Sequence, residues 1–546
     1  MTTIDTHATG AADAGAGLAC VADWLTTTDH KRIGRLYVGT SLVALVGSLV
    51  VAALLAAERI STSSTIVDLG SLTQLFSVYR FGLTYVVMLP LLLGVAVAVV
   101  PLQVGSRAIA FPRTAMSGFW AWLLGAVLAI ISIAANGGPN GGNKRFVDLF
   151  LLSAILCIGG LLATTVSLAT SILTTRTPGM NMRRVPLFTW SVLVMALGLV
   201  IALPVVAGDL LILFIGHKYP SLSELSGNRV LGTTFAFGFS QTTTLLFAVP
   251  VLGFLAEVVA TANRSRTRQR GIVLAGIGLT VSAVFGVALQ WPTGIRSGFS
   301  SLSGGDKVSD LLPFALVHLL PLLGAFLAVV LTLGSIRKGV KLHPALVFGV
   351  LAALLTFDGF LGNALANIGD AGLAGTSFEE GVWLALVYGA VIAGMGALVH
   401  WGPKLWGRLI PMKAVLPLAL LTFVGGTLAS LPMMVAGFAD QPGAVFPVVQ
   451  DGDSVVAFSY SGPASLWNGL AAAGHALVLL SVLAFVALAL RSFLAGEKAG
   501  DDPWDGLTLE WATTSPAPAD NFADLHVVQS AEPLLDLKPS NGSDAR

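Results

Sequence analysis

The chain has 546 residues, of which 55% are hydrophobic and only 11% are charged, against roughly 25% charged in an ordinary soluble protein. So few charged side chains cannot cover a soluble surface, and the composition therefore excludes a string of soluble domains and indicates a membrane protein. With 30 basic and 29 acidic residues, the net charge of +1 also gives no electrostatic basis for binding nucleic acid.

Twelve apolar segments are long enough to cross the bilayer, since about 20 helical residues span its hydrocarbon core. We therefore predict an all-α polytopic membrane protein whose twelve transmembrane helices lie within residues 36–493. The predicted helices are 36–57, 81–103, 116–135, 147–173, 186–214, 232–260, 272–291, 311–335, 344–367, 380–401, 413–436 and 467–490.

The two ends of the chain are polar. Residues 1–35 contain no apolar segment, which predicts an N-terminal tail, and the proline-rich residues 494–546 predict an irregular or partly disordered C-terminal extension. Loops after even-numbered helices carry fifteen Lys and Arg residues, whereas the other interhelical loops carry seven. Because basic loops stay in the cytoplasm, we expect a multi-pass protein of the cell (inner) membrane with both termini cytoplasmic.

Four segments near helix ends carry a family resemblance. They are Trp24 to Tyr37, Pro101 to Arg113, Thr177 to Trp190 and Asp502 to Ala512. Together they resemble subunit I of the haem-copper oxidases, the cytochrome c oxidase subunit 1 family, over about residues 24–522. The resemblance implies the family's twelve-helix arrangement. Because these segments are loops and caps, it bears on fold and assembly rather than on chemistry.

The resemblance does not extend to the family's metal ligands. Family members hold one haem between two histidines, a second haem on one histidine and a copper ion on three. Counted from the neighbouring motifs, none of the six matching positions holds a histidine: they are Tyr79, Gln241, Ala288, Leu289, Gly381 and Trp383. Copper and haem iron need imidazole or similarly strong ligands, so we predict no haem, no copper and no catalytic residue.

Groups that would support oxidase chemistry are missing as well. The acidic entrance of one proton path, which the resemblance places before Phe111, corresponds to Ala108, and no lysine lies between Lys307 and Lys338 for a second path. The arginines expected to bind haem propionates are replaced by the stretch 441–444. A proton pump needs titratable groups at membrane depth, so this pattern indicates a degenerate active site.

Three residues within helices are candidates for a replacement haem site, namely Tyr79, His318 and His475. The two histidines lie at a similar depth, roughly 12 Å from the outer ends of their helices, and could meet there. Alternatively, each is a neutral histidine hydrogen-bonded between helices. Tyr79 could bind iron as a tyrosinate, or it could be an interfacial tyrosine whose neighbour Arg80 snorkels to the surface. Trp383 would occupy space that a haem needs.

Three functions fit these observations. The favoured one is a catalytically inactive, subunit I-like integral membrane protein that acts as a structural or regulatory subunit of a respiratory complex. Its partners would be other membrane subunits and the lipid bilayer. The second is a genuine terminal oxidase subunit of the electron transport chain, which oxidises cytochrome c, reduces oxygen and pumps protons. The third is a transporter or channel that uses the vacated haem cavities.

Overall fold

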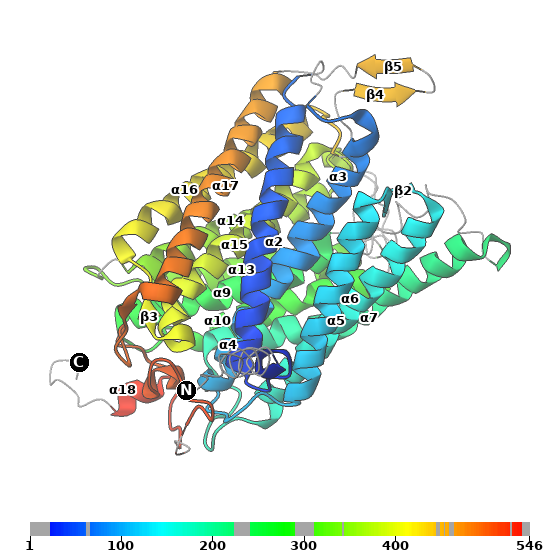
Figure 1. Ribbon diagram of the computed structural model, residues 1–546. Coiled ribbons are helices and arrows are strands. Elements are labelled where there is room, and N and C mark those ends of the chain that lie inside the picture. Colours follow the sequence, from blue (N-terminus) through cyan, green and yellow to red (C-terminus); the bar gives the residue numbers. More distant parts are fainter. Residues whose placement is uncertain are drawn as a thin grey trace, which may run out of the picture.

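The computed structural model describes residues 22–61, 66–222, 241–289, 309, 311–340, 343–443, 448–451, 454–457, 463–522, 524 and 527–537. Within this part of the chain, twelve helices are long and apolar enough to cross a membrane, and they pack side by side in one bundle (Figure 1). They follow the predicted segments in order. The prediction of an all-α polytopic membrane protein with twelve spans is confirmed.

Nine of the described spans are continuous helices: α2 (His30–Glu58), α5 (Pro112–Ala134), α6 (Lys144–Thr174), α7 (Leu187–Lys218), α9 (Gln241–Asn263), α14 (Pro344–Ala366), α15 (Ser377–Trp406), α16 (Met412–Phe438) and α17 (Ala464–Ala495). The second joins α3 (Leu69–Phe81) to α4 (Leu89–Gln103) through a π-helical stretch, Gly82–Met88. The seventh joins α10 (Arg270–Leu279) to α11 (Val284–Leu289) through a 3-10 turn. The eighth joins a π-helical turn (Ala315–Leu319) to α13 (Leu320–Gly334).

Short strands and turns complete the two ends of the bundle. Three antiparallel pairs are formed by β1 (Gly137–Gly138) with β2 (Gly141–Gly142), β3 (Arg408–Leu409) with β6 (Glu497–Lys498), and β4 (Val448–Asp451) with β5 (Ser454–Ala457). The start of α2, the end of α17 and the short helix α18 (Pro533–Leu537) lie at one end, which we call the terminal face (Figure 1). The end that carries β4 and β5 is the opposite face.

Helix α2 begins at His30, before the predicted start at residue 36. Asp29 caps it, its side chain accepting a hydrogen bond from the Lys31 backbone N–H at 2.9 Å. Hydropathy misses this first turn because the turn is polar, although it is buried. His30 Nδ1 lies 3.1 Å from the Val97 carbonyl oxygen, and its Nε2 contacts Asn521.

The described part of the C-terminal extension is packed against the terminal face. It contains only a 3-10 turn (Leu509–Ala512) and α18 as helical elements among the described residues. Glu510 is fully buried, and Trp511 is 3% exposed. The extension therefore contributes to the core, which its polar composition does not reveal.

Candidate functional site

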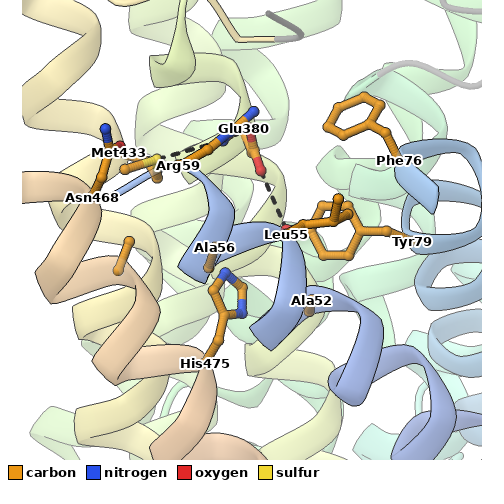
Figure 2. Close-up of a pocket in the computed structure, with 11 residues that line it drawn as sticks. Ala52, Leu55, Ala56, Arg59, Phe76, Tyr79, Glu380, Met433, Asn468 and His475 are labelled. Atoms are coloured by element: carbon orange, nitrogen blue, oxygen red, sulfur yellow. Dashed lines mark hydrogen bonds and ion pairs between the residues drawn. The ribbon is translucent and has the colours of Figure 1, made fainter. Parts of the chain in front are cut away.

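A buried polar cluster lies between α2, α3 and α15 near the opposite face (Figure 2). Arg59 Nη1 lies 2.7 Å from Glu380 Oε2, and the two side chains are only 7% and 6% exposed. The Tyr79 hydroxyl donates to the other carboxylate oxygen of Glu380 at 3.3 Å, and Arg59 Nη2 donates to the Gly443 carbonyl at 2.6 Å. These hydrogen bonds offset part of the cost of removing two charges from water.

The ends of two helices position this ion pair. Arg59 is the C-terminal cap of α2, and Glu380 lies in the first turn of α15, where the Thr376 hydroxyl caps the helix by accepting from the Phe378 N–H. A cation at a helix C-terminus and an anion at a helix N-terminus are each favoured by the helix dipole. The ion pair therefore joins two helix ends of opposite partial charge.

His475 of α17 completes the cluster. Its Nδ1 and the Tyr388 hydroxyl hydrogen-bond at 2.5 Å, and its ring centroid lies 6.2 Å from that of Tyr79. A cavity of about 20 Å³ remains between these side chains, lined also by Phe76, Asn468 and Met433 (Figure 2). That volume accommodates about one water molecule.

Three of the six aligned ligand positions lie in or beside this cluster, and each is closely packed or hydrogen-bonded. A Cβ atom on Gly381 would lie 2.6 Å from the Ser430 carbonyl oxygen and 2.7 Å from Met434 Cγ. Trp383 is 4% exposed, and its indole N–H donates to the Thr84 hydroxyl at 3.1 Å. Tyr79, the third, donates to Glu380. The residues present here do not fit a haem held between two imidazoles.

The interfacial interpretation of Tyr79 and Arg80 is wrong. Tyr79 is only 2% exposed, and its ring packs edge-on against Trp383 at 5.0 Å between centroids. The Arg80 guanidinium lies 4.5 Å from the centroid of the Trp383 ring, a cation–π arrangement, rather than reaching away from the protein. Sequence position at a helix end suggested an interface, whereas the contacts with α15 bury the tyrosine.

The other aligned positions border stretches that lie outside the described part of the structure. Ala288 and Leu289 belong to α11, and Leu289 is 46% exposed. Gln241 is the first residue of α9, and its side chain lies outside the described part of the structure. Among the residues that the structure describes, no group of three or more His, Cys, Asp and Glu side chains could hold a metal ion.

The two candidate histidines contact different helices. His318 Nδ1 lies 2.9 Å from Asn363 Nδ2 of α14, whereas His475 hydrogen-bonds to Tyr388 of α15. The structure instead brings His475 close to Tyr79. Sequence analysis missed Arg59 and Glu380. Two features pointed to them: each is an ionisable residue at the end of an apolar segment, and Glu380 directly precedes the aligned position Gly381.

A second buried polar cluster lies at the terminal face, where the four segments that carry the family resemblance meet. Glu510 Oε1 accepts from Gln103 Nε2 at 2.9 Å and from the Trp401 indole N–H at 3.1 Å. Thr189 donates to Gln103 Oε1 at 2.6 Å. Asn521 links the same region to the first turn of α2. Burial raises the pKa of the Glu510 carboxyl above its ordinary value.

Comparison with known proteins assigns the family. A model of the family described as Cytochrome C and Quinol oxidase polypeptide I matches residues 32–477. The chain belongs to this family. The resemblance drawn from the loop segments is therefore confirmed.

Similar proteins cover nearly the whole chain. A Streptomyces avermitilis protein named as a cytochrome c oxidase subunit 1-beta is 27% identical, over 96% of this chain and 94% of the relative. Cytochrome c oxidase subunit 1 of Bacillus subtilis is 24% identical, over 94% and 82%. Cytochrome bo(3) ubiquinol oxidase subunit 1 of Buchnera aphidicola is 26% identical, over 94% and 79%. These relatives support the family assignment over nearly the whole length of the chain.

Proposed function

We propose that this chain is a catalytically inactive member of the oxidase subunit I family that serves as a structural or regulatory subunit of a respiratory membrane complex. The observation that carries the proposal is the packing at the aligned ligand positions. Gly381 has no space for a side chain, and Trp383 and Tyr79 fill the interior with hydrogen bonds of their own. The Arg59 to Glu380 ion pair lies in the same region.

This proposal implies that the protein binds neither haem nor copper. The test is metal analysis together with a reduced-minus-oxidised optical spectrum of the chain purified from native membranes. The Bacillus subtilis relative, purified in parallel, serves as the positive control. We expect no Soret band and no stoichiometric copper. One haem per chain would overturn the proposal.

A terminal oxidase subunit is the second candidate, because the relatives carry that name. Its metals would need ligands other than the six aligned positions. Tyr79, His318 and His475 would be the first to substitute, since they are the candidates that lie within the spans. Oxygen consumption with reduced cytochrome c or a quinol decides between the two candidates. Turnover that is lost when one of these three residues is replaced would establish an oxidase.

We also propose that both termini are cytoplasmic and that the membrane is the cell membrane. The excess of basic residues in the loops of the terminal face supports this orientation. A reporter that is active only in the cytoplasm should work when fused after Arg546 and remain silent when inserted within residues 440–455. The reverse pattern would overturn the orientation.

The partners are proposed to be other membrane subunits of an oxidase-like complex. The four loop segments that carry the family resemblance are engaged within the chain itself, as the Glu510 and Asn521 contacts illustrate. We therefore expect partner subunits to bind the outer surface of the helix bundle rather than these loop segments. Native electrophoresis after extraction in mild detergent should show the chain in a hetero-oligomer. A stable monomer without partners would contradict this part of the proposal.

A further inference from the structure

Helix α14 carries a carboxyl group at membrane depth on its outward face. Asp358 lies three residues from Leu355, the middle of the 23-residue helix, which places it about 5 Å from the centre of the span. The side chain is partly buried. Ionisable side chains at this depth are costly and normally face a partner group.

No partner for this carboxyl lies within the described part of the chain. The acidic groups Asp148, Glu257 and Glu380 of other spans each bond to a side chain of this protein. For Asp358, by contrast, no hydrogen bond or ion pair with another described residue is present. Asp358 is therefore an acidic residue within a membrane span that has no hydrogen-bonding or ion-pairing partner among the described residues.

The residues around Asp358 form a regular seam. Positions four and three residues apart alternate along one stripe of α14, in the order Val347, Leu351, Leu354, Asp358, Leu361 and Leu365. Val347 and Leu351 are partly buried against the core, whereas Leu354, Leu361 and Leu365 face outward. Leu354 is 41% exposed, and Leu361 and Leu365 are each 39% exposed. This spacing is that of a left-handed helix–helix contact, in which a single polar seam residue fixes register and partner.

Helix α13 borders the same face. Phe326 of α13 is 46% exposed, and its ring centroid lies 6.2 Å from that of Phe357, the residue before Asp358. Leu323 and Val330 of α13 are also 46% exposed. The seam of α14 therefore adjoins an aromatic and aliphatic surface on the neighbouring helix, which enlarges the area available to a partner.

We propose that the α14 seam docks a transmembrane helix of another subunit, which presents a basic side chain to Asp358. A seam made only of leucines would suit lipid tails and a partner helix equally well. The Asp358 carboxyl favours the partner helix, because lipid tails cannot pair with it whereas a Lys, Arg or His on a neighbouring helix can. This inference rests on the proposed role as a subunit of a membrane complex and names the surface that it uses.

The first test replaces the carboxyl and measures the fraction of chain in the hetero-oligomer after mild-detergent extraction. We expect D358L to reduce that fraction by about tenfold, in line with the loss of one polar interaction between membrane helices, and D358E to retain it. Replacement by leucine suits an outward apolar face, and an unchanged size-exclusion profile of the released chain verifies folding. A hetero-oligomer that persists in D358L overturns the inference while leaving the proposed function intact. A wild-type chain that purifies without partner subunits would overturn both this inference and the proposed function.

The second test does not depend on a variant of Asp358. A photo-crosslinking residue at Leu354 or Leu361 should capture a smaller membrane protein, and peptide mapping should place a basic residue at the crosslinked helix. The control position is Leu480 of α17, which is 64% exposed, and it should not give this product. Crosslinks only to lipid, or only to a second copy of this chain, would overturn the proposed occupant.

Discussion

At the scale of single residues, close packing and a buried ion pair occupy the region of Tyr79, Gly381 and Trp383, the positions that the sequence resemblance matches to metal ligands. Gly381 brings α15 against the backbone of α16, and Trp383 donates to α3–α4 through Thr84. The Arg59 to Glu380 ion pair lies next to them, and hydrogen bonds from Tyr79 to Glu380 and from Arg59 to Gly443 help to hold it. Each of these groups depends on its neighbours, because an unpaired buried charge or an overfilled contact is destabilising.

Breaking the ion pair on one side should destabilise the protein strongly. E380L leaves Arg59 buried without its counterion, and we expect a loss of about 3–5 kcal/mol in the free energy of unfolding. The double variant R59M/E380L should recover most of the loss, since no uncompensated charge remains. Thermal unfolding in detergent measures both. R145M is the control, because Arg145 is exposed, and it should stay within about 0.5 kcal/mol of wild type. Equal unfolding of the single and double variants would contradict the pairing.

Restoring a histidine at one aligned position should not restore a haem site. In G381H the new Cβ would meet the α16 backbone at 2.6 Å, so overpacking should cost about 1–3 kcal/mol or more. We expect a lower unfolding temperature and no Soret band after expression with added haem. A288H, at the partly exposed Ala288 of α11, is the matched control and should unfold like wild type. A folded G381H protein with a Soret band would show that this packing does not exclude haem.

At the scale of elements, helix contact rests on small residues, because hydrophobic burial gives no preference between protein and lipid inside the bilayer. Helices α5 and α6 show this clearly. A Cβ on Gly160 would lie 2.3 Å from the Trp122 backbone nitrogen, and one on Gly125 would lie 2.4 Å from the Cys157 nitrogen. The adjacent Gly159 faces open space, with nothing within 4 Å.

This pair of neighbouring glycines gives a matched prediction. G160A should destabilise the protein, by about 1–3 kcal/mol, since the backbone of α5 would have to move. G159A should leave stability unchanged or raise it by up to about 1 kcal/mol, because alanine is the better helix former. Unfolding temperatures of the two variants, measured side by side, test the contact. Similar values for both would contradict the close approach of α5 and α6.

Hydropathy predicted the twelve spans because the bilayer imposes their length and apolar composition. It could not predict the polar contacts that end them. The start of α2 at His30 depends on contacts with Val97 and Asn521, which are distant in the sequence. The same holds at the site: the sequence identified Tyr79, but its contact with Glu380 requires the packing of α3 against α15. In the sequence Arg59 resembles an ordinary loop cation, because its counterion Glu380 lies 321 residues away and only the folded structure brings the two together.

At the scale of the whole molecule, the C-terminal extension closes the terminal face over the helix ends. Glu510 contacts α4 through Gln103 and α15 through Trp401, and Thr508 donates to Glu257 of α9 at 2.9 Å. The extension therefore ties together helices that are far apart in the chain. Removing its described part would expose polar groups of three helices, so we expect that part of the extension to fold together with the bundle.

This arrangement predicts a pH-dependent stability. Burial raises the folded-state pKa of Glu510 above its ordinary value of 4.5. At a pH between the unfolded-state pKa and this raised folded-state pKa, the folded state keeps a proton on Glu510 that the unfolded state releases. The contribution of this group to stability is therefore fully present below pH 4.5 and is lost as the pH rises through the folded-state pKa. E510Q keeps the shape and a hydrogen-bonding oxygen but cannot ionise. Unfolding temperatures measured across that range should fall with pH in the wild type more steeply than in E510Q. Parallel curves for the two proteins would show that Glu510 does not titrate on unfolding.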